Sequence, residues 1–384
     1  MRAASITMFC VHRLILAFSL AGLLTACAAP PATPRPPDYW PTAGWRTAAP
    51  ADHGLDAGAL AQIPALAADK LPYLDSVLII RNGYLVHEAY FNGYDAAALH
   101  DVASVTKSWT SAIIGRARAD GHLADLEAPL SSLLPEYFTG GRHADKAGIT
   151  LRHLLQMRSG LEWDEDTLDT GGYGTAEELL ARDLVEWLLS FPMTHAPGEA
   201  WNYNTGNSQL LSAVFQRAVG RSLADYAEEA VFAPLGIERY EWLSDGHDIT
   251  LGGQNLRLTP RDMAKLGLLY LHGGQWEGRP LIPADWVTES TTPQGDALYV
   301  PTQETLPIEF YGYHWWLWHA SWFNDRSPAL AAQGYAGQNI LILPRLNLII
   351  ITTANLQADP QQANRQRAGL YEQLILGVIL PAVK

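Results

Sequence analysis

The sequence predicts an α/β (α+β) fold in which strands from both ends of the chain build one sheet, with an all-helical lobe between them. Runs of β-favouring residues lie at 76–90 near the start and at 339–353 near the end. Between about 104 and 235, apolar residues recur at helical spacing instead. A sheet must bury its apolar face, so the two distant groups of strands are expected to meet around a shared core.

The first elements of the domain are predicted at 55–90. Leu and Ala recur at helical spacing over 55–71, which predicts a helix. The run 76–90 contains two β-rich stretches joined by Asn82-Gly83. Asn-Gly between two such stretches is the strongest short-range signal of a hairpin, because both residues adopt positive φ readily. We therefore expect a two-stranded hairpin here.

The middle of the chain is expected to be mostly helical. Apolar residues recur at helical spacing in four segments: 151–157, 175–189, 208–219 and 223–232. The segment 254–272 combines a strand end with a helix that has a clear start. Thr259 is placed to cap that helix, and Pro260 occupies its first position.

Strand signals return towards the end of the chain. The stretch 311–318 is dense in aromatic residues, and 339–343 and 348–353 flank a turn at 344–347, which predicts another hairpin. A final helix is expected over about 362–380.

The N-terminal residues predict an export signal. A positive start, an apolar run and the ending Leu24-Thr25-Ala26-Cys27 resemble a bacterial lipoprotein signal with its lipobox, so residues 1–26 are expected to be removed and Cys27 lipidated. The Pro-rich residues 27–45 are then expected to form a tether, and 46–384 one folded domain, with the helical lobe at about 108–245. Ordinary cleavage or an uncleaved anchor are the alternatives. We expect a lipid-anchored protein of the cell envelope facing the periplasm, with the outer membrane favoured because Ala28, not Asp, follows the cysteine.

Charge and cysteine content exclude several classes of function. The net charge is −14, and removal of Arg2 and Arg13 with the signal would make it −16. An acidic protein is a poor binder of nucleic acid, which requires Lys and Arg to displace counterions. Cys10 would be lost with the signal and Cys27 occupied by lipid, so no disulfide is expected. We find no Walker loop, dinucleotide fingerprint or zinc spacing, and expect neither a cofactor nor a metal.

Ser104 and Lys107 are the best candidates for a catalytic pair. They open an apolar helix, and residues i and i+3 lie on one helix face, so the hydroxyl and the amine are expected to meet. The helix start also favours a developing anion. A serine hydroxyl needs a nearby base, and lysine can be that base only where burial or a cationic neighbour lowers the pKa of its amine. The alternative is a capping serine with a surface lysine.

Two further segments supply candidate groups. Tyr203 lies in a turn before an amphipathic helix, and a phenol near a lysine can relay a proton to a leaving group. Gly334, Tyr335 and Gly337 precede a β-like run, where glycine permits close approach of the backbone to a ligand. The N–H groups of Tyr335 and Ser104 are predicted to form an oxyanion hole. A packed loop tyrosine and a simple Gly-rich turn are the alternatives.

Two other clusters are less specific. His314 and His319 would lie on opposite faces of a strand, which makes them a poor metal pair and favours aromatic packing around the cleft. Residues 163–166 (Trp-Asp-Glu-Asp) could line the cleft or bind a cation, but an exposed acidic turn is the favoured interpretation.

Together, these segments resemble the serine β-lactamase and D-Ala-D-Ala peptidase-like hydrolase family. Ser104-Val-Thr-Lys107 is similar to its first motif and Tyr203 begins the second; 149–161, 256–267 and 334–338 also resemble family segments. The resemblance runs from about 50 to 380. It implies the β-lactamase/transpeptidase-like fold, with an antiparallel sheet, a helical lobe and the active site between them.

The chain departs from the family pattern in two motifs. The second normally reads Tyr-x-Asn, but Thr205 stands in its third place and Asn207 follows later. The third normally carries Lys or His before a Gly, but residue 332 is Ala. In relatives that act on β-lactams or peptidoglycan, that cation helps to bind the substrate carboxylate. The departures are more similar to the class C-like branch with esterases and 6-aminohexanoate-dimer hydrolases. Asn207, Gly334 and Gly337 are the expected substrate-binding residues.

The expected function is therefore that of a serine hydrolase that cleaves an ester or amide in a small molecule or short peptide through an acyl-enzyme. One alternative is a D-Ala-D-Ala carboxypeptidase or β-lactamase. Another is a non-catalytic lipoprotein of the same fold that binds a cell-envelope ligand.

Overall fold

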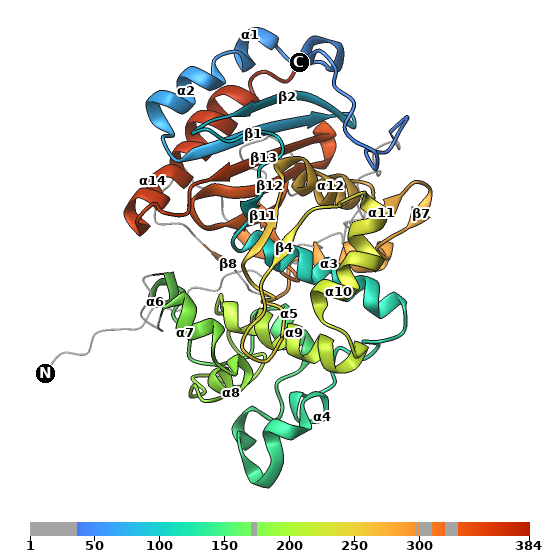
Figure 1. Cartoon of the computed structure of the whole chain (residues 1–384), viewed down its shortest axis with the longest axis vertical. Helices are drawn as coiled ribbons and strands as arrows, with labels where there is room; N and C mark the ends of the chain where they lie inside the picture. The colour runs from blue at the N-terminus through green and yellow to red at the C-terminus, as the bar shows by residue number, and fades with distance from the viewer. Residues whose placement is uncertain (1–36, 170–174, 296–297, 300–308, 319–328) are drawn as a thin grey trace, which may run out of the picture. The chain divides into compact units, whose positions relative to one another are not determined.

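A computed structural model of the chain describes residues 37–169, 175–295, 298–299, 309–318 and 329–384 (Figure 1). The strands are β1 (Leu74–Arg81), β2 (Tyr84–Tyr90), β3 (His100–Asp101), β4 (Glu241–Trp242), β5 (Leu256–Leu258), β6 (Gln275–Trp276), β7 (Arg279–Pro280), β8 (Leu298–Tyr299), β9 (Glu309–Tyr311), β10 (Trp316–Trp318), β11 (Ala329–Gly334), β12 (Gln338–Leu343) and β13 (Leu348–Ala354).

The α-helices are α1 (Ala57–Leu60), α2 (Ile63–Lys70), α3 (Val105–Ala119), α4 (Leu130–Leu133), α5 (Leu151–Leu155), α6 (Glu165–Asp169), α7 (Ala176–Leu180), α8 (Leu184–Leu189), α9 (Thr205–Val219), α10 (Leu223–Ala227), α11 (Ala233–Leu235), α12 (Pro260–Leu271), α13 (Ala284–Ser290) and α14 (Pro360–Gly369). Shorter or wider helical segments are η1 (Pro50–His53), η2 (Pro135–Gly141), η3 (Ala144–Lys146), η4 (Glu228–Phe232), η6 (Tyr335–Gly337), η7 (Pro344–Leu346) and η8 (Leu370–Ile379).

The main sheet joins the two ends of the domain, as predicted. Among the described residues its strands lie in the order β2-β1-β13-β12-β11-β10-β9-β8, and all neighbouring strands are antiparallel. The two chain ends are joined by the pairing of β1 with β13, in which Leu78 lies opposite Ile351. The predicted α/β (α+β) fold with an antiparallel sheet is therefore confirmed.

The turn between β1 and β2 has the backbone geometry that its two residues favour. Asn82 has a φ of 52° and Gly83 a φ of 83°, so both adopt the left-handed conformation that a tight hairpin turn requires. The predicted hairpin at 76–90 is confirmed.

Helices cover both faces of the sheet. Successive strand residues point to opposite faces. Accordingly, Val77 and Ile79 belong to the core formed with the terminal helices, whereas Leu78 and Ile80 belong to the core formed with α12. Figure 1 shows α1 and α2 beside β1 and β2. The start of α12 is as predicted, because the Thr259 side chain accepts a hydrogen bond from the Asp262 N–H.

The helical lobe is built around α9, which lies against α3, α5 and α8 (Figure 1). Leu210, Leu211, Val214 and Phe215 of α9 are completely buried. Burial of this helix fixes the position of its first residue, and hence of the loop that precedes it.

Two segments differ from the sequence-based prediction. The helix expected over 175–189 is interrupted: Asp183 accepts a hydrogen bond from the Glu186 N–H at 3.0 Å and so caps a separate helix, α8. The aromatic stretch 311–318 forms two strands, β9 and β10, around a turn in which His314 has a φ of 61°. His319 lies outside the described residues.

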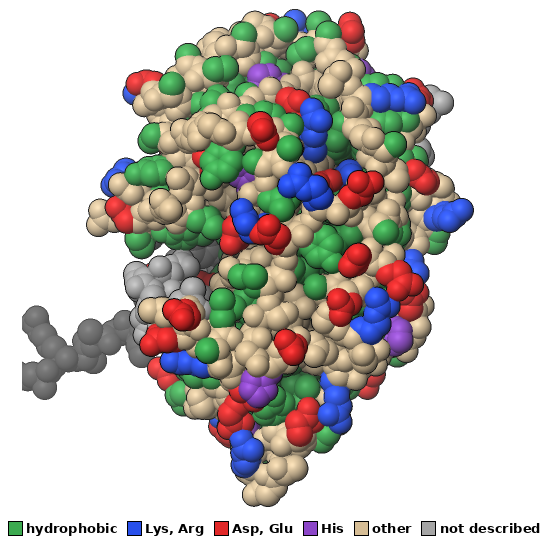
Figure 2. Space-filling view, in the orientation of Figure 1, with side chains coloured by type: hydrophobic (Ala, Val, Ile, Leu, Met, Phe, Trp, Pro, Cys, Tyr) green, Lys and Arg blue, Asp and Glu red, His purple; other side chains and the backbone are tan. Residues whose placement is uncertain are grey.

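On the face shown in Figure 2, acidic and basic side chains are interspersed and often adjacent. In the described part of the chain, no helix is both long enough and apolar enough to cross a bilayer. The predicted signal at 1–26, with Cys27, falls outside the described residues.

Candidate active site

Ser104 lies directly before α3, in a turn with unusual backbone geometry. Ala103 has a φ of 47°, which is uncommon for a residue with a side chain. The Asp101 carboxylate accepts a hydrogen bond from the Ala103 N–H at 2.8 Å and holds the turn in this conformation. Strained residues persist only where their surroundings enforce them, and often mark functional sites.

Lys107 lies one turn further along α3 and is almost completely buried, with 1% of its surface exposed. Its Nζ donates hydrogen bonds to Ser104 Oγ at 2.8 Å and to the Gly253 carbonyl at 3.1 Å. The hydroxyl and amine thus meet at the start of the helix. Gly253, which sequence reasoning missed, comes from the segment before β5 and orients the amine from the side of the helical lobe.

A buried histidine supports this part of α3. His314 Nδ1 lies 3.2 Å from the Lys107 carbonyl oxygen, and the Ser108 hydroxyl donates to the His314 carbonyl at 2.7 Å. Burial lowers the pKa of His314 to about 3, so the imidazole is neutral at physiological pH. Among the described residues, no group of His, Cys, Asp and Glu has the geometry of a metal site.

The Tyr203 side chain reaches the same place from the loop before α9. Its ring stacks on Trp316 at a centroid distance of 5.4 Å and meets Tyr311 edge-on at 6.0 Å. Lys107 Nζ lies 4.9 Å from the ring centroid of Tyr203. The structure therefore brings Ser104, Lys107 and Tyr203 together from two separate elements.

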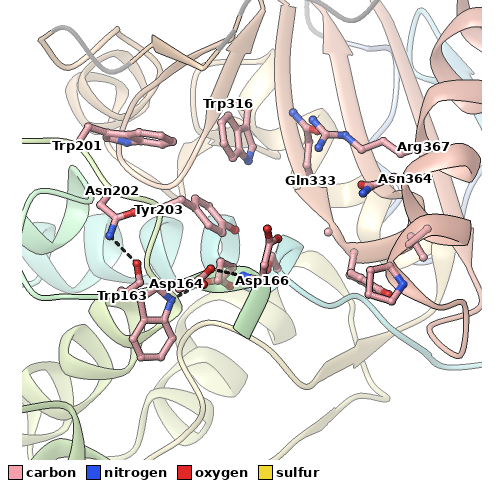
Figure 3. Close-up of a pocket in the computed structure, with 17 residues that line it drawn as sticks. Trp163, Asp164, Asp166, Trp201, Asn202, Tyr203, Trp316, Gln333, Asn364 and Arg367 are labelled. Atoms are coloured by element: carbon pink, nitrogen blue, oxygen red, sulfur yellow. Dashed lines mark hydrogen bonds between the residues drawn. The ribbon is translucent and has the colours of Figure 1, made fainter. Parts of the chain in front are cut away.

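A cavity of about 680 Å³ opens at Ser104 and Tyr203. Figure 3 shows Trp163, Asp164 and Asp166 on one side of it and Gln333, Asn364 and Arg367 on the other. Its lining residues are Ser104, Trp163, Asp164, Glu165, Asp166, Trp201, Asn202, Tyr203, Trp316, Gln333, Gly334, Tyr335, Ala336, Pro360, Ala363, Asn364 and Arg367. A second hollow of about 390 Å³ shares Ser104, Glu165, Tyr335 and Pro360 with it. Ser104 is thus accessible from two adjoining spaces.

The Gly-rich segment lies against the turn that carries Ser104. A Cβ at Gly334 would lie 2.7 Å from the Val102 carbonyl oxygen, so only glycine allows this approach. Gly334 and Tyr335 both line the cavity. Gly337 does not; it packs against Leu370 behind the site.

Asn207 does not line the cavity either. It is completely buried in α9, where its Nδ2 lies 3.7 Å from Met157 Sδ. Its Oδ1 has no hydrogen-bond partner among the described residues. The geometry therefore places Asn207 behind the site, rather than in contact with a ligand in the cavity.

Sequence reasoning missed a cation in the cavity wall. Residue 332, where the family pattern has Lys or His, is a completely buried Ala. Arg367 of α14 lines the cavity instead, 3.4 Å from the buried carboxylate of Glu309. Burial raises the pKa of Glu309, and the positive charge of Arg367 opposes that effect. Arg367 follows Asn364 by one helical turn, but nothing local in the sequence indicates that this helix face borders the cavity.

The acidic segment 163–166 lines the cavity, which was the less favoured of the two interpretations of its sequence, although Asp164 and Asp166 are exposed as expected. Trp163 is only 8% exposed, and Asp164, Glu165 and Asp166 line the cavity with it. The tryptophan beside the acids was the available signal, because an indole in an acidic turn indicates a packed segment.

Comparison with known proteins identifies relatives of this chain. The model of the beta-lactamase family matches residues 61–373. A 6-aminohexanoate-dimer hydrolase of Paenarthrobacter ureafaciens is 24% identical over 320 residues, covering 79% of this chain and 77% of that protein. Esterase EstB of Burkholderia gladioli is 35% identical over 147 residues, or 36% of this chain and 37% of that protein. A penicillin-binding protein structure from Bacillus halodurans has the same fold, with a TM-score of 0.61 at 19% identity, covering 81% of this chain and all (100%) of that one.

Proposed function

The chain belongs to the beta-lactamase family of serine hydrolases, and we propose that it cleaves an ester or amide through an acyl-enzyme formed on Ser104. One observation carries the proposal: a buried lysine amine lies 2.8 Å from the serine hydroxyl. Removing an ammonium from water is costly, so burial favours the uncharged amine that a general base requires. The relatives named 6-aminohexanoate-dimer hydrolase and esterase EstB support this class of substrate.

In the proposed acylation step, Ser104 Oγ attacks the substrate carbonyl carbon while its proton passes to Lys107 Nζ. The carbonyl oxygen becomes an oxyanion, which the N–H groups of Ser104 and Tyr335 stabilise. When the intermediate collapses, the Tyr203 phenol donates a proton to the leaving alcohol or amine and regains one from the Lys107 ammonium. The products are the free leaving group and an ester on Ser104.

Deacylation follows the same route in reverse. A water molecule attacks the acyl carbon and its proton passes through the same basic groups. The acid is released as Ser104 Oγ regains its proton. The aromatic rings of Trp316 and Tyr311, which contact Tyr203, shield this proton path from bulk water.

The substrate is proposed to be a small molecule or short peptide. A cavity of about 680 Å³ has the size of typical small-molecule sites. A D-Ala-D-Ala carboxypeptidase or β-lactamase is the second candidate, and one observation favours it: Arg367 supplies a guanidinium to the cavity wall, where a substrate carboxylate could bind. The buried Ala332 argues against it.

A fluorophosphonate probe tests the nucleophile. We expect the wild type and Ser132→Ala, a control at an exposed serine, to be labelled, and Ser104→Ala to remain unlabelled. Equal labelling of Ser104→Ala would refute the assignment. Hydrolysis of short-chain nitrophenyl esters with little turnover of a chromogenic cephalosporin would separate the esterase or amidase from the second candidate.

We also propose that the enzyme is anchored to a membrane of the cell envelope. Cys27 is proposed to carry the lipid that anchors the protein to the envelope membrane, with 27–45 as the tether. Labelling with radioactive palmitate in cells should mark the wild type and not Cys27→Ser. The proposed anchor would be contradicted if the wild-type protein carried no palmitate and were recovered in the soluble periplasmic fraction.

A further inference from the structure

We propose that Glu165 is a positioning residue that fixes the backbone on either side of Tyr203, and thereby the location of its phenol. The inference rests on the proposed function, in which that phenol carries the leaving-group proton. Glu165 is half-buried and lines both hollows that meet at Ser104.

The Glu165 carboxylate accepts three hydrogen bonds from two residues. Its Oε2 accepts from the indole N–H of Trp163 at 2.6 Å and from the Thr205 N–H at 3.0 Å, and its Oε1 accepts from the Thr205 hydroxyl. Thr205 is the first residue of α9 and follows Tyr203 by two positions. The carboxylate therefore ties the start of α9 to the segment that begins at Trp163.

A second contact ties the other side of the tyrosine to the same segment. The Asn202 side chain donates from Nδ2 to the Trp163 carbonyl oxygen at 3.0 Å, drawn as a dashed line in Figure 3. The Asn202 N–H also donates to the Met157 carbonyl at 2.9 Å. Tyr203 thus lies between two anchored neighbours.

The aromatic contacts alone do not fix the phenol to the accuracy that proton transfer needs. Stacking on Trp316 sets the plane of the Tyr203 ring but resists sliding within that plane only weakly. A proton is transferred only between groups within about 2.6–3.2 Å, and a misplacement of about 1 Å can cost about 10²-fold in rate. The hydrogen bonds of Glu165 to Thr205 add a restraint on the backbone two residues after Tyr203.

Substitutions of Glu165 can distinguish a positioning role of its hydrogen bonds from a direct role of its negative charge. In Glu165→Gln, the amide oxygen can still accept from Trp163 and the Thr205 N–H, and the amide NH₂ can donate to the Thr205 hydroxyl. Glu165→Ala removes all three bonds. A positioning residue should therefore tolerate Gln, whereas a general base should not.

The experiment compares Glu165→Ala and Glu165→Gln in the wild type and in Tyr203→Phe, using the full chain and a short-chain nitrophenyl ester. Active sites are titrated with a fluorophosphonate and thermal unfolding is followed in parallel. Glu162→Ala is the matched control, because Glu162 immediately precedes this segment, is exposed, and has no side-chain hydrogen bond among the described contacts.

We expect kcat per titrated site to fall about 10²-fold in Glu165→Ala, with KM changed by less than about threefold. Glu165→Gln should stay within about fivefold of the wild type, and Glu162→Ala should match it. In Tyr203→Phe, Glu165→Ala should cause no additional loss, because the phenol that it positions is already absent.

Three results would overturn the inference. The first is an equal loss of kcat in Glu165→Gln and Glu165→Ala, and the second is that Glu165→Ala lowers kcat by the same factor in Tyr203→Phe as in the wild type. The third is full activity of Glu165→Ala. If Tyr203→Phe itself keeps wild-type activity, the proposed function fails instead. Should Glu165→Ala not fold, Thr205→Val removes only the hydroxyl donor. It should lower kcat several-fold in the wild type and not at all in Tyr203→Phe.

Discussion

The α-carbon of Gly334 lies so close to the Val102 carbonyl oxygen that a Cβ at residue 334 would come within 2.7 Å of it. The same hypothetical Cβ would lie 3.1 Å from the Cβ of Ala103. The end of β11 is thus in van der Waals contact with the turn that presents Ser104, and Tyr335 lines the same two hollows as Ser104.

We predict that Gly334→Ala pushes β11 away from this turn and widens the proposed oxyanion hole. The expected result is a fall in kcat/KM of about tenfold to a hundredfold, measured with a nitrophenyl ester. Gly148→Ala is the control, because a Cβ at Gly148 meets no atom within 4 Å. Wild-type kcat/KM in Gly334→Ala would show that this contact does not matter for catalysis.

Lys107 is predicted to be required for acylation. Lys107→Met removes the base, and Lys107→Arg replaces it with a guanidinium that does not deprotonate, so both should lose about 10²- to 10⁴-fold in the acylation rate. The rate of fluorophosphonate labelling measures this step directly. Lys70→Met, at a side chain that is 54% exposed, should label like the wild type. Labelling of Lys107→Arg at the wild-type rate would exclude the lysine as base.

Asp75 is predicted to destabilise the protein at neutral pH. Burial raises the pKa of this carboxyl to about 6, even though Asn92 donates a hydrogen bond to it at 3.0 Å. The folded state therefore binds its proton more tightly than the unfolded state, and stability is lost as the pH rises from about 4 through 6. Asp75→Asn should raise the free energy of unfolding at pH 8 by on the order of 1 kcal/mol and leave it unchanged near pH 3.5. Asp69→Asn, at a side chain that is 70% exposed, is the control for urea unfolding at both pH values.

His314 should have the opposite dependence. Its pKa in the folded state is about 3 against 6.5 ordinarily, so the unfolded state takes up the proton first. The contribution of the neutral His314 to the free energy of unfolding is fully present above pH 6.5. It is lost as the pH falls towards 3, by up to about 1.4 kcal/mol per pH unit. His314→Asn should flatten the pH dependence of urea unfolding in this interval, and the exposed His195→Asn should not. An unchanged slope in His314→Asn would mean that this histidine does not drive acid unfolding.

Several local elements could be predicted because their causes lie within a few residues. The positive φ angles at Asn82 and Gly83 follow from those two residue types, and Thr259 caps α12 through its own side chain. The meeting of Ser104 and Lys107 follows from helix geometry alone. The helix break at Asp183 escaped prediction because apolar periodicity continues across it, although a local cap starts a new helix there.

Contacts between segments far apart in the chain could not be predicted from local sequence patterns. The Gly253 carbonyl that orients Lys107 lies 146 residues away along the chain. Trp316, which stacks on Tyr203, belongs to β10, whereas the sequence pattern showed only one aromatic stretch over 311–318 and did not separate β10 from β9. The hydrogen bonds of Glu165 to Thr205 span 40 residues, and they join the acidic segment 163–166 to the start of α9.

The antiparallel hairpins, the start of α12 and the serine–lysine pair could be predicted from local patterns, because hydrogen bonding and side-chain spacing within one segment suffice for them. Which charges face Ser104, what surrounds the Tyr203 ring and how closely β11 approaches Ser104 emerge only in the folded chain. These depend on packing between segments far apart in the chain, and the pattern of a single segment does not encode which partner buries it.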